Sequence, residues 1–222
     1  MIYVSWAALY EGASDRSYYD VLIPRLMEEI ILKDGIRAVT IPPNPAKVFS
    51  RRESRKVAEA ACEAKEAFHL LFIHADKGGR NLAAELPERS CAICEATYDR
   101  CQFPLARCVV IAPLHETEAW VLADPTAVTA ALGYSGSAFD LDLPPDARAA
   151  ERLVDPKAVL NTAVRQVRGR RSFSVHQIFP AIAQRQSIQL LRGAPSFHAF
   201  EVLVKRALSD IGCVGFDLSS NQ

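Results

Sequence analysis

The sequence predicts an α/β protein with a mostly parallel sheet flanked by helices, and with a helical C-terminal region. Short, apolar, β-prone runs alternate with longer segments of helical periodicity over residues 2–123. This alternation is typical of right-handed crossovers between parallel strands. No buried strand is expected after residue 133. The chain has 222 residues, half of them hydrophobic, which is enough to bury a substantial core.

The expected elements follow from local patterns. Residues 2–9 are apolar and end at Glu11-Gly12, as in a buried central strand. Pro42, Pro43 and Pro45 predict a loop. The other expected strands are 36–41, 68–73 and 107–112, and the expected helices are 16–33, 50–66, 81–100 and one that begins near 116.

The chain divides into an α/β core at residues 1–132 and a helical subdomain at residues 133–222 that packs on it. Residues 133–147 are rich in Gly, Ser, Pro and Asp and are expected to form a loop. Asp155-Pro156 then predicts a helix start, because Asp is a common cap and Pro favours the first turn.

Composition excludes several classes of protein. The 26 basic and 26 acidic residues balance, which argues against coating of nucleic acid by bulk charge. No run approaches the roughly 20 apolar residues of a membrane span, and no signal peptide is evident. Six cysteines in a chain of this length then favour free thiols in the cytoplasm. A zinc half-site at Cys91-x-x-Cys94 is the less favoured alternative.

Acidic residues follow three of the expected strands. Glu11 follows the first strand, Asp76 the third, and Glu116 and Glu118 the fourth. The carboxyl ends of parallel strands share one edge, where ligands usually bind. Clustered carboxylates repel one another unless a cation lies between them, and oxygen ligands favour Mg²⁺ or Mn²⁺. The competing interpretation is that these residues are ordinary caps and solubilising groups, as expected for Asp15.

Several motifs resemble a known family. They are Glu11-Gly12-Ala13-Ser14-Asp15, Phe72-Ile73-His74-Ala75-Asp76, the segment 111–124 with Thr117-Glu118-Ala119-Trp120, Asp155-Pro156-Lys157, and Pro195-Ser196-Phe197 with Phe200. Together they resemble the domain-of-unknown-function 4276 family, a Toprim-like group similar to the nuclease half of OLD-type proteins. The resemblance implies a Toprim-like sheet, a divalent metal and cleavage of nucleic acid, often beside an ATPase partner in defence systems.

The resemblance also suggests roles for these residues. Glu11 would be a metal ligand or general base, Asp76 a metal ligand, and Glu118 the third carboxylate, with Glu116 as its alternative. His74 occupies the first position of the family's Asp-x-Asp motif. Its imidazole would ligate the metal, with a preference for Mn²⁺ or Zn²⁺, or shuttle a proton. A weakened or inactive site is the other interpretation of His74.

Basic residues offer candidate phosphate contacts. Lys77 lies beside Gly78-Gly79, and a cluster surrounds Gly169; its members are Arg165, Arg168, Arg170 and Arg171. A second cluster comprises Arg51, Arg52, Arg55 and Lys56. Arginine forks suit phosphate backbones, although each cluster alone is more typical of a solvated helix face. Beside an acidic metal site, the cluster around Gly169 becomes a candidate for substrate docking.

Three functional hypotheses follow. The first is a Mg²⁺- or Mn²⁺-dependent nuclease that acts in defence or DNA repair. The second is a non-catalytic sensor or regulatory partner of an ATPase, with a degenerate site. The third is a phosphatase or phosphotransferase on small molecules. A homo-oligomer is compatible with each of them.

Overall fold

Four parallel strands form the main sheet, in the order β4-β2-β5-β6. The computed structural model describes residues 1–50, 53–74, 88–169 and 174–215. The strands are β2 (Trp6–Leu9), β4 (Lys47–Phe49), β5 (Leu70–Ile73) and β6 (Cys108–Val110). In the register, Ala8 lies opposite both Val48 and Phe72. Because every pairing is parallel, all four carboxyl ends meet at one edge.

The predicted first strand, residues 2–9, is divided between two sheets. β1 (Ile2–Tyr3) pairs in parallel with β3 (Val39–Thr40) in a separate two-stranded sheet. Val4 N still donates to Thr40 O, but the Ser5 carbonyl accepts from His69 N, beside β5. The chain therefore changes partner at Ser5. The expected loop after the prolines also contains a short strand, β4.

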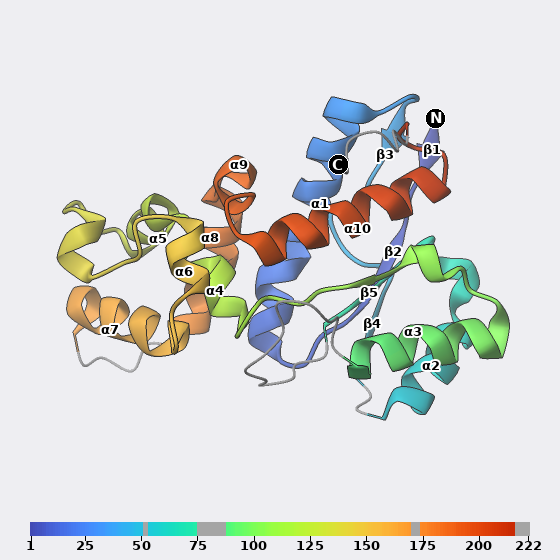
Figure 1. The fold of residues 1–222 in the computed structure, drawn as a ribbon, viewed down its shortest axis with the longest axis horizontal. Helices are drawn as coiled ribbons and strands as arrows, with labels where there is room; N and C mark the ends of the chain where they lie inside the picture. Colours follow the sequence, from blue (N-terminus) through green and yellow to red (C-terminus); the bar gives the residue numbers. More distant parts are fainter. Residues whose placement is uncertain (51–52, 75–87, 170–173, 216–222) are drawn as a thin grey trace.

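Helices cover both faces of the main sheet (Figure 1). α1 (Ala13–Asp34) and α10 (Pro195–Asp210) lie on one face, and α2 (Ser54–Glu63) and α3 (Glu88–Cys101) on the other. Alternate strand residues supply the two cores: Trp6, Ala8 and Phe72 pack on the α1 side, and Ala7, Leu9 and Ile73 pack on the α2 side. The α/β class with parallel strands and flanking helices is thus confirmed.

The C-terminal part is helical, as predicted. After residue 133 its elements are α6 (Ala147–Glu151), α7 (Pro156–Arg168), α8 (Phe179–Arg185), α9 (Ile188–Leu191) and α10, with short 3₁₀ turns at Ala138–Leu141 and Val175–Ile178. Two helices assigned to the predicted core, α4 (Thr117–Val121) and α5 (Pro125–Leu132), pack with them. They lie beside the sheet, and α10 returns across it (Figure 1). One apolar core runs continuously from the sheet into these helices. Among the described helices, none combines the length and apolar character that a membrane crossing requires.

A buried glutamine joins three helices. Gln186 is fully buried; its Oε1 accepts a hydrogen bond from Tyr18 Oη at 2.7 Å. Its Nε2 donates to the carbonyls of Trp120 (2.7 Å) and Val121 (3.1 Å). Buried polar groups of this kind are costly unless they are paired. The amide therefore fixes the end of α4 against α1 and α8.

The end of α10 is joined to the end of α1. Gly35 and Val214 form an isolated antiparallel bridge, and Ile36 N donates to Cys213 O at 3.1 Å. Lys205 Nζ lies 2.9 Å from Asp34 Oδ2 between the same two helices. These contacts hold the C-terminal helix to the first helix of the chain.

The expectation of six free cysteines was wrong. Disulfides join Cys62 to Cys101 and Cys94 to Cys108, and they connect α2 to α3 and α3 to β6. Cys94 is therefore not available to a zinc half-site with Cys91. Cys91 and the buried Cys213 are free. The pairing depends on how the α2 and α3 layer packs on the sheet, which cysteine spacing does not encode.

Candidate functional site

The candidate site lies where β2 and β5 end. His74 directly follows β5, and its backbone N–H donates to Leu9 O at 2.9 Å, at the end of β2. The helix after β2 covers one face of the sheet, and α3, the next described helix after β5, covers the other. A crevice at the carboxyl ends of two such strands is the usual ligand site in parallel α/β sheets. Glu11 and His74 are both placed at this edge, as predicted.

Asp15 is a central residue of this site and has more than a capping role. Its Oδ2 accepts from Gly12 N at 3.0 Å, which caps α1. Its Oδ1 accepts from Thr117 Oγ1 at 2.8 Å, and His74 Nδ1 lies 4.0 Å from Oδ2. Tyr19 Oη lies 3.2 Å from Thr117 Oγ1. Because the Thr117 hydroxyl donates to Asp15, Tyr19 is the donor in this second contact.

Two further carboxylates lie at the start of α4. Glu118 is only 6% exposed, and this burial raises the pKa of its carboxyl group. The negative charges of Glu116 and Asp15 raise this pKa further, whereas the positive charge of Lys157 lowers it. Glu116 Oε2 is buried and has no hydrogen-bond partner among the described residues. Asp15, Glu116 and Glu118 therefore share one electrostatic neighbourhood, built from α1 and the start of α4.

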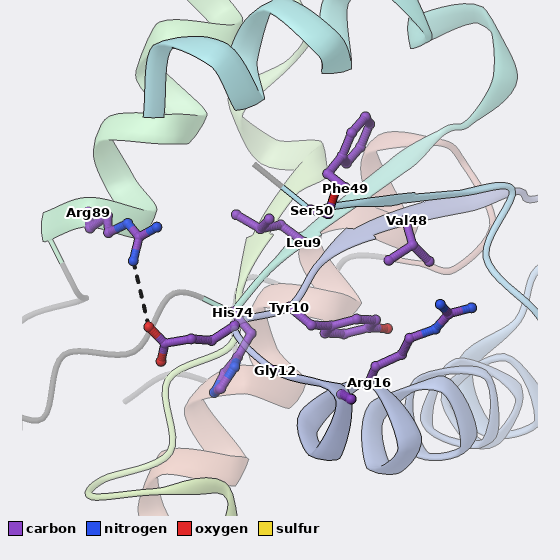
Figure 2. A pocket seen from close by; sticks show the side chains of 11 residues that line it. Leu9, Tyr10, Gly12, Arg16, Val48, Phe49, Ser50, His74 and Arg89 are labelled. Carbon is purple, nitrogen blue, oxygen red and sulfur yellow. Dashed lines mark ion pairs between the residues drawn. The ribbon is translucent and has the colours of Figure 1, made fainter. Parts of the chain in front are cut away.

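A pocket of about 650 Å³ has His74 in its wall. Figure 2 shows Arg89 and Arg16 at opposite ends of this pocket, with the Tyr10 side chain between them. Glu11 also lines it, and its carboxylate lies 3.7 Å from Arg89 Nη1. His74 thus lines the pocket and also lies 4.0 Å from Asp15.

The predicted metal triad is described only in part. Asp76 and Lys77 lie outside the described residues. Within the described segments, no three His, Cys, Asp or Glu side chains form a group that would hold a metal ion. The joint role of Glu11, Asp76 and Glu118 stays a prediction. The donor chemistry nevertheless suits a hard cation, because Glu116 Oε2 is a buried oxygen without a partner beside a second buried carboxylate.

The predicted basic cluster lies away from these carboxylates. Arg165 and Arg168 are in the last turn of α7, whereas Lys157, which is close enough to affect the pKa of Glu118, is in its first turn. At 1.5 Å per residue, Lys157 and Arg168 are about 16 Å apart along the helix. Arg170 and Arg171 lie outside the described residues.

Sequence reasoning missed Arg16, Arg89 and Lys157 as cations of this site. Lys157 belongs to the Asp155-Pro156-Lys157 motif, and this motif was the one sequence feature that could have pointed to it. Arg16 and Arg89 carry no such signal, because their positions depend on how α1 and α3 dock against the sheet.

Comparison with protein-family models, with curated proteins and with solved structures finds no match. The Toprim-like hypothesis therefore depends on the motifs of the chain and on the site described above.

Proposed function

We propose that the chain is a divalent-metal-dependent phosphodiester hydrolase that acts on nucleic acid. The observation that carries this proposal is the convergence of Asp15, Glu116 and Glu118 beside the carboxyl ends of β2 and β5. A cluster of carboxylates does not stabilise the fold by itself, because burying neighbouring carboxylates raises the free energy of their ionised forms. A bound cation would remove that cost.

Glu116 and Glu118, with Asp76 and Glu11 as partners, would hold Mg²⁺ or Mn²⁺. When bound, the ion would lower the pKa of a water molecule and stabilise charge on the phosphate. Asp15 would attract a protonated His74 by its charge, because His74 Nδ1 lies 4.0 Å from Asp15 Oδ2, beyond hydrogen-bond distance. His74 would then hold or transfer a proton between the pocket and the carboxylates, which suits an imidazole near neutral pH.

The test is a cleavage assay on single-stranded and duplex DNA and RNA with Mn²⁺ or Mg²⁺. Glu118→Gln and Asp76→Asn should each lower cleavage by at least about 100-fold, since loss even of residues that only support metal ligands often costs 10- to 100-fold. Glu63→Gln is the matched control, because Glu63 is exposed on α2. Undiminished cleavage in both site variants would refute the assignment.

A second candidate is a non-catalytic sensor or regulatory partner of an ATPase. One observation favours it: His74 stands where the family that the motifs resemble has the first Asp of its Asp-x-Asp motif. Titration with Mn²⁺ followed by calorimetry separates the candidates. Binding that Glu118→Gln abolishes supports the hydrolase, and absence of both binding and cleavage supports the regulatory partner.

A cytoplasmic location conflicts with the two disulfides, because cytosolic thiols are kept reduced in most organisms. Trapping of free thiols in intact cells before lysis decides the question. Six trapped thiols would support the cytoplasmic location, and two would contradict it.

A further inference from the structure

We infer that the pocket at the carboxyl ends of β2 and β4 is a subsite for one unpaired nucleotide of the substrate strand. The inference rests on the proposed hydrolase function, since it places the strand beside the carboxylates. Glu11 and His74 line the pocket, and His74 Nδ1 lies 4.0 Å from Asp15 Oδ2. The other lining residues come from β2, β4, the start of α1 and, with Arg89, from α3 (Figure 2). A ligand held there would lie next to the residues proposed to do the chemistry.

The wall of the pocket suits a sugar and a base. Leu9, Val48 and Phe49 supply apolar surface from the ends of β2 and β4. Tyr10 is fixed in place, because its hydroxyl donates to Asp20 Oδ1 at 2.8 Å and its ring stacks on Tyr19 with centroids 6.1 Å apart. Sites for small ligands combine apolar surface with oriented polar groups, and aromatic rings accept bases of any sequence.

Two guanidinium groups supply the charge that a nucleotide requires. Arg16 is 56% exposed and its Nε lies 3.1 Å from Asp20 Oδ2. Arg89 lies at the other end of the pocket, 3.7 Å from the Glu11 carboxylate. Both ion pairs are partly exposed to solvent, which weakens such pairs, so a phosphate can compete with Asp20 and Glu11 for these arginines. Arginine forks bind phosphate oxygens in bidentate geometry.

The size of the pocket is compatible with one nucleotide. A volume of about 650 Å³ is in the range of sites for small molecules. A base enters a pocket of this kind only after it leaves the duplex stack. We therefore expect the substrate strand to present a single-stranded stretch or a frayed end at this position.

The experiment measures binding without hydrolysis. The full chain is titrated in EDTA with thymidine monophosphate, thymidine, inorganic phosphate, a short oligothymidylate and a blunt duplex. We expect the nucleotide and the oligothymidylate to bind and the nucleoside and the duplex to bind at least about tenfold more weakly. A charge-assisted hydrogen bond of about 1.5–3 kcal/mol corresponds to a factor of about ten or more.

Variants then locate the site. Arg16→Gln and Arg89→Gln should each weaken nucleotide binding about tenfold, whereas Arg206→Gln, an exposed arginine on α10, should leave it unchanged. Val48→Trp fills the pocket but keeps both arginines, and it should abolish binding of the nucleotide without changing the circular dichroism spectrum. Equal binding by the native chain and all these variants would overturn the inference.

The two proposals can fail separately. Arginine-dependent binding in EDTA without metal-dependent cleavage would preserve the subsite and reject the hydrolase. Cleavage that depends on Glu118 but is unaffected by Arg16→Gln, Arg89→Gln and Val48→Trp would preserve the hydrolase and reject the subsite. Equal affinity for inorganic phosphate and the nucleotide would reduce the pocket to an anion site and would also overturn the inference.

Discussion

Thr117 Oγ1 donates a hydrogen bond of 2.8 Å to Asp15 Oδ1, although 102 residues separate the two in sequence. The contact joins the first turn of α4 to the first turn of α1. It also places the carboxylates of Glu116 and Glu118, on either side of Thr117, near Asp15. The geometry of the candidate site therefore depends on this bond.

Thr117→Val should lower both stability and cleavage. The valine retains the shape of threonine but leaves the Tyr19 hydroxyl and one Asp15 oxygen without their partner. We expect a loss of about 1–3 kcal/mol in the free energy of unfolding, measured by urea denaturation. Thr117→Ser keeps the hydroxyl and is the control. Equal stability of the valine and serine variants would contradict this interpretation.

Glu118 should make stability depend on pH. Its raised pKa means that the folded chain binds the proton more tightly than the unfolded chain does. This contribution is complete below the ordinary glutamate pKa and is lost as the pH rises through the folded-state pKa. Glu118→Gln should therefore melt at a higher temperature than the native chain at about pH 8, with a smaller difference at about pH 4.

The measurement for Glu118 is thermal unfolding followed by circular dichroism across this pH range, with Glu63→Gln as the exposed control. Addition of Mn²⁺ at the higher pH should raise the melting temperature of the native chain but not that of Glu118→Gln. A Glu118→Gln variant that melts lower at every pH would show that the carboxylate is stabilising, against our expectation.

Gln186→Leu should be among the most destabilising single substitutions in the helical region. It removes the hydrogen bonds to Tyr18 Oη and to the carbonyls of Trp120 and Val121. We expect a cost of about 3 kcal/mol, because several buried polar groups lose their partner together. Gln184→Leu, an exposed position on the same helix, is the control and should change the free energy of unfolding by less than about 0.5 kcal/mol.

The two disulfides should contribute unequally to stability. Cys62 and Cys101 are 39 residues apart, and Cys94 and Cys108 are 14 apart. Chain entropy predicts that replacing the first pair with alanine costs about 4 kcal/mol and the second about 3 kcal/mol. Denaturation in guanidinium without reductant measures both. Cys91→Ala is the control, and thiol titration of the denatured chain should find two free thiols before reduction.

Local chemistry made much of the fold predictable. Asp155 was expected to cap a helix with proline in its first turn, and its Oδ1 accepts from Ala158 N at 2.8 Å. The alternating faces of Trp6, Ala7 and Ala8 likewise follow from strand geometry. Such features depend on neighbours within a few residues, which the sequence displays directly.

Features set by distant partners were not predictable in the same way. The division of residues 2–9 depends on Thr40 and His69, which lie far along the chain. Asp15 has two roles, and only the cap, made with Gly12, is local. The acidic edge was anticipated at Glu11 and Glu118, but the bond from Thr117 to Asp15 that organises it requires the tertiary fold.

The bridge between Gly35 and Val214 has a consequence for synthesis on the ribosome. The sheet face that α10 covers stays open until residues 195–214 have left the exit tunnel, so the nascent protein exposes apolar surface up to that point. Exposed apolar surface makes an incompletely folded chain prone to aggregation. A chaperone that shields this face should therefore raise the yield of native chain, and a ribosome stalled before residue 195 should present it continuously.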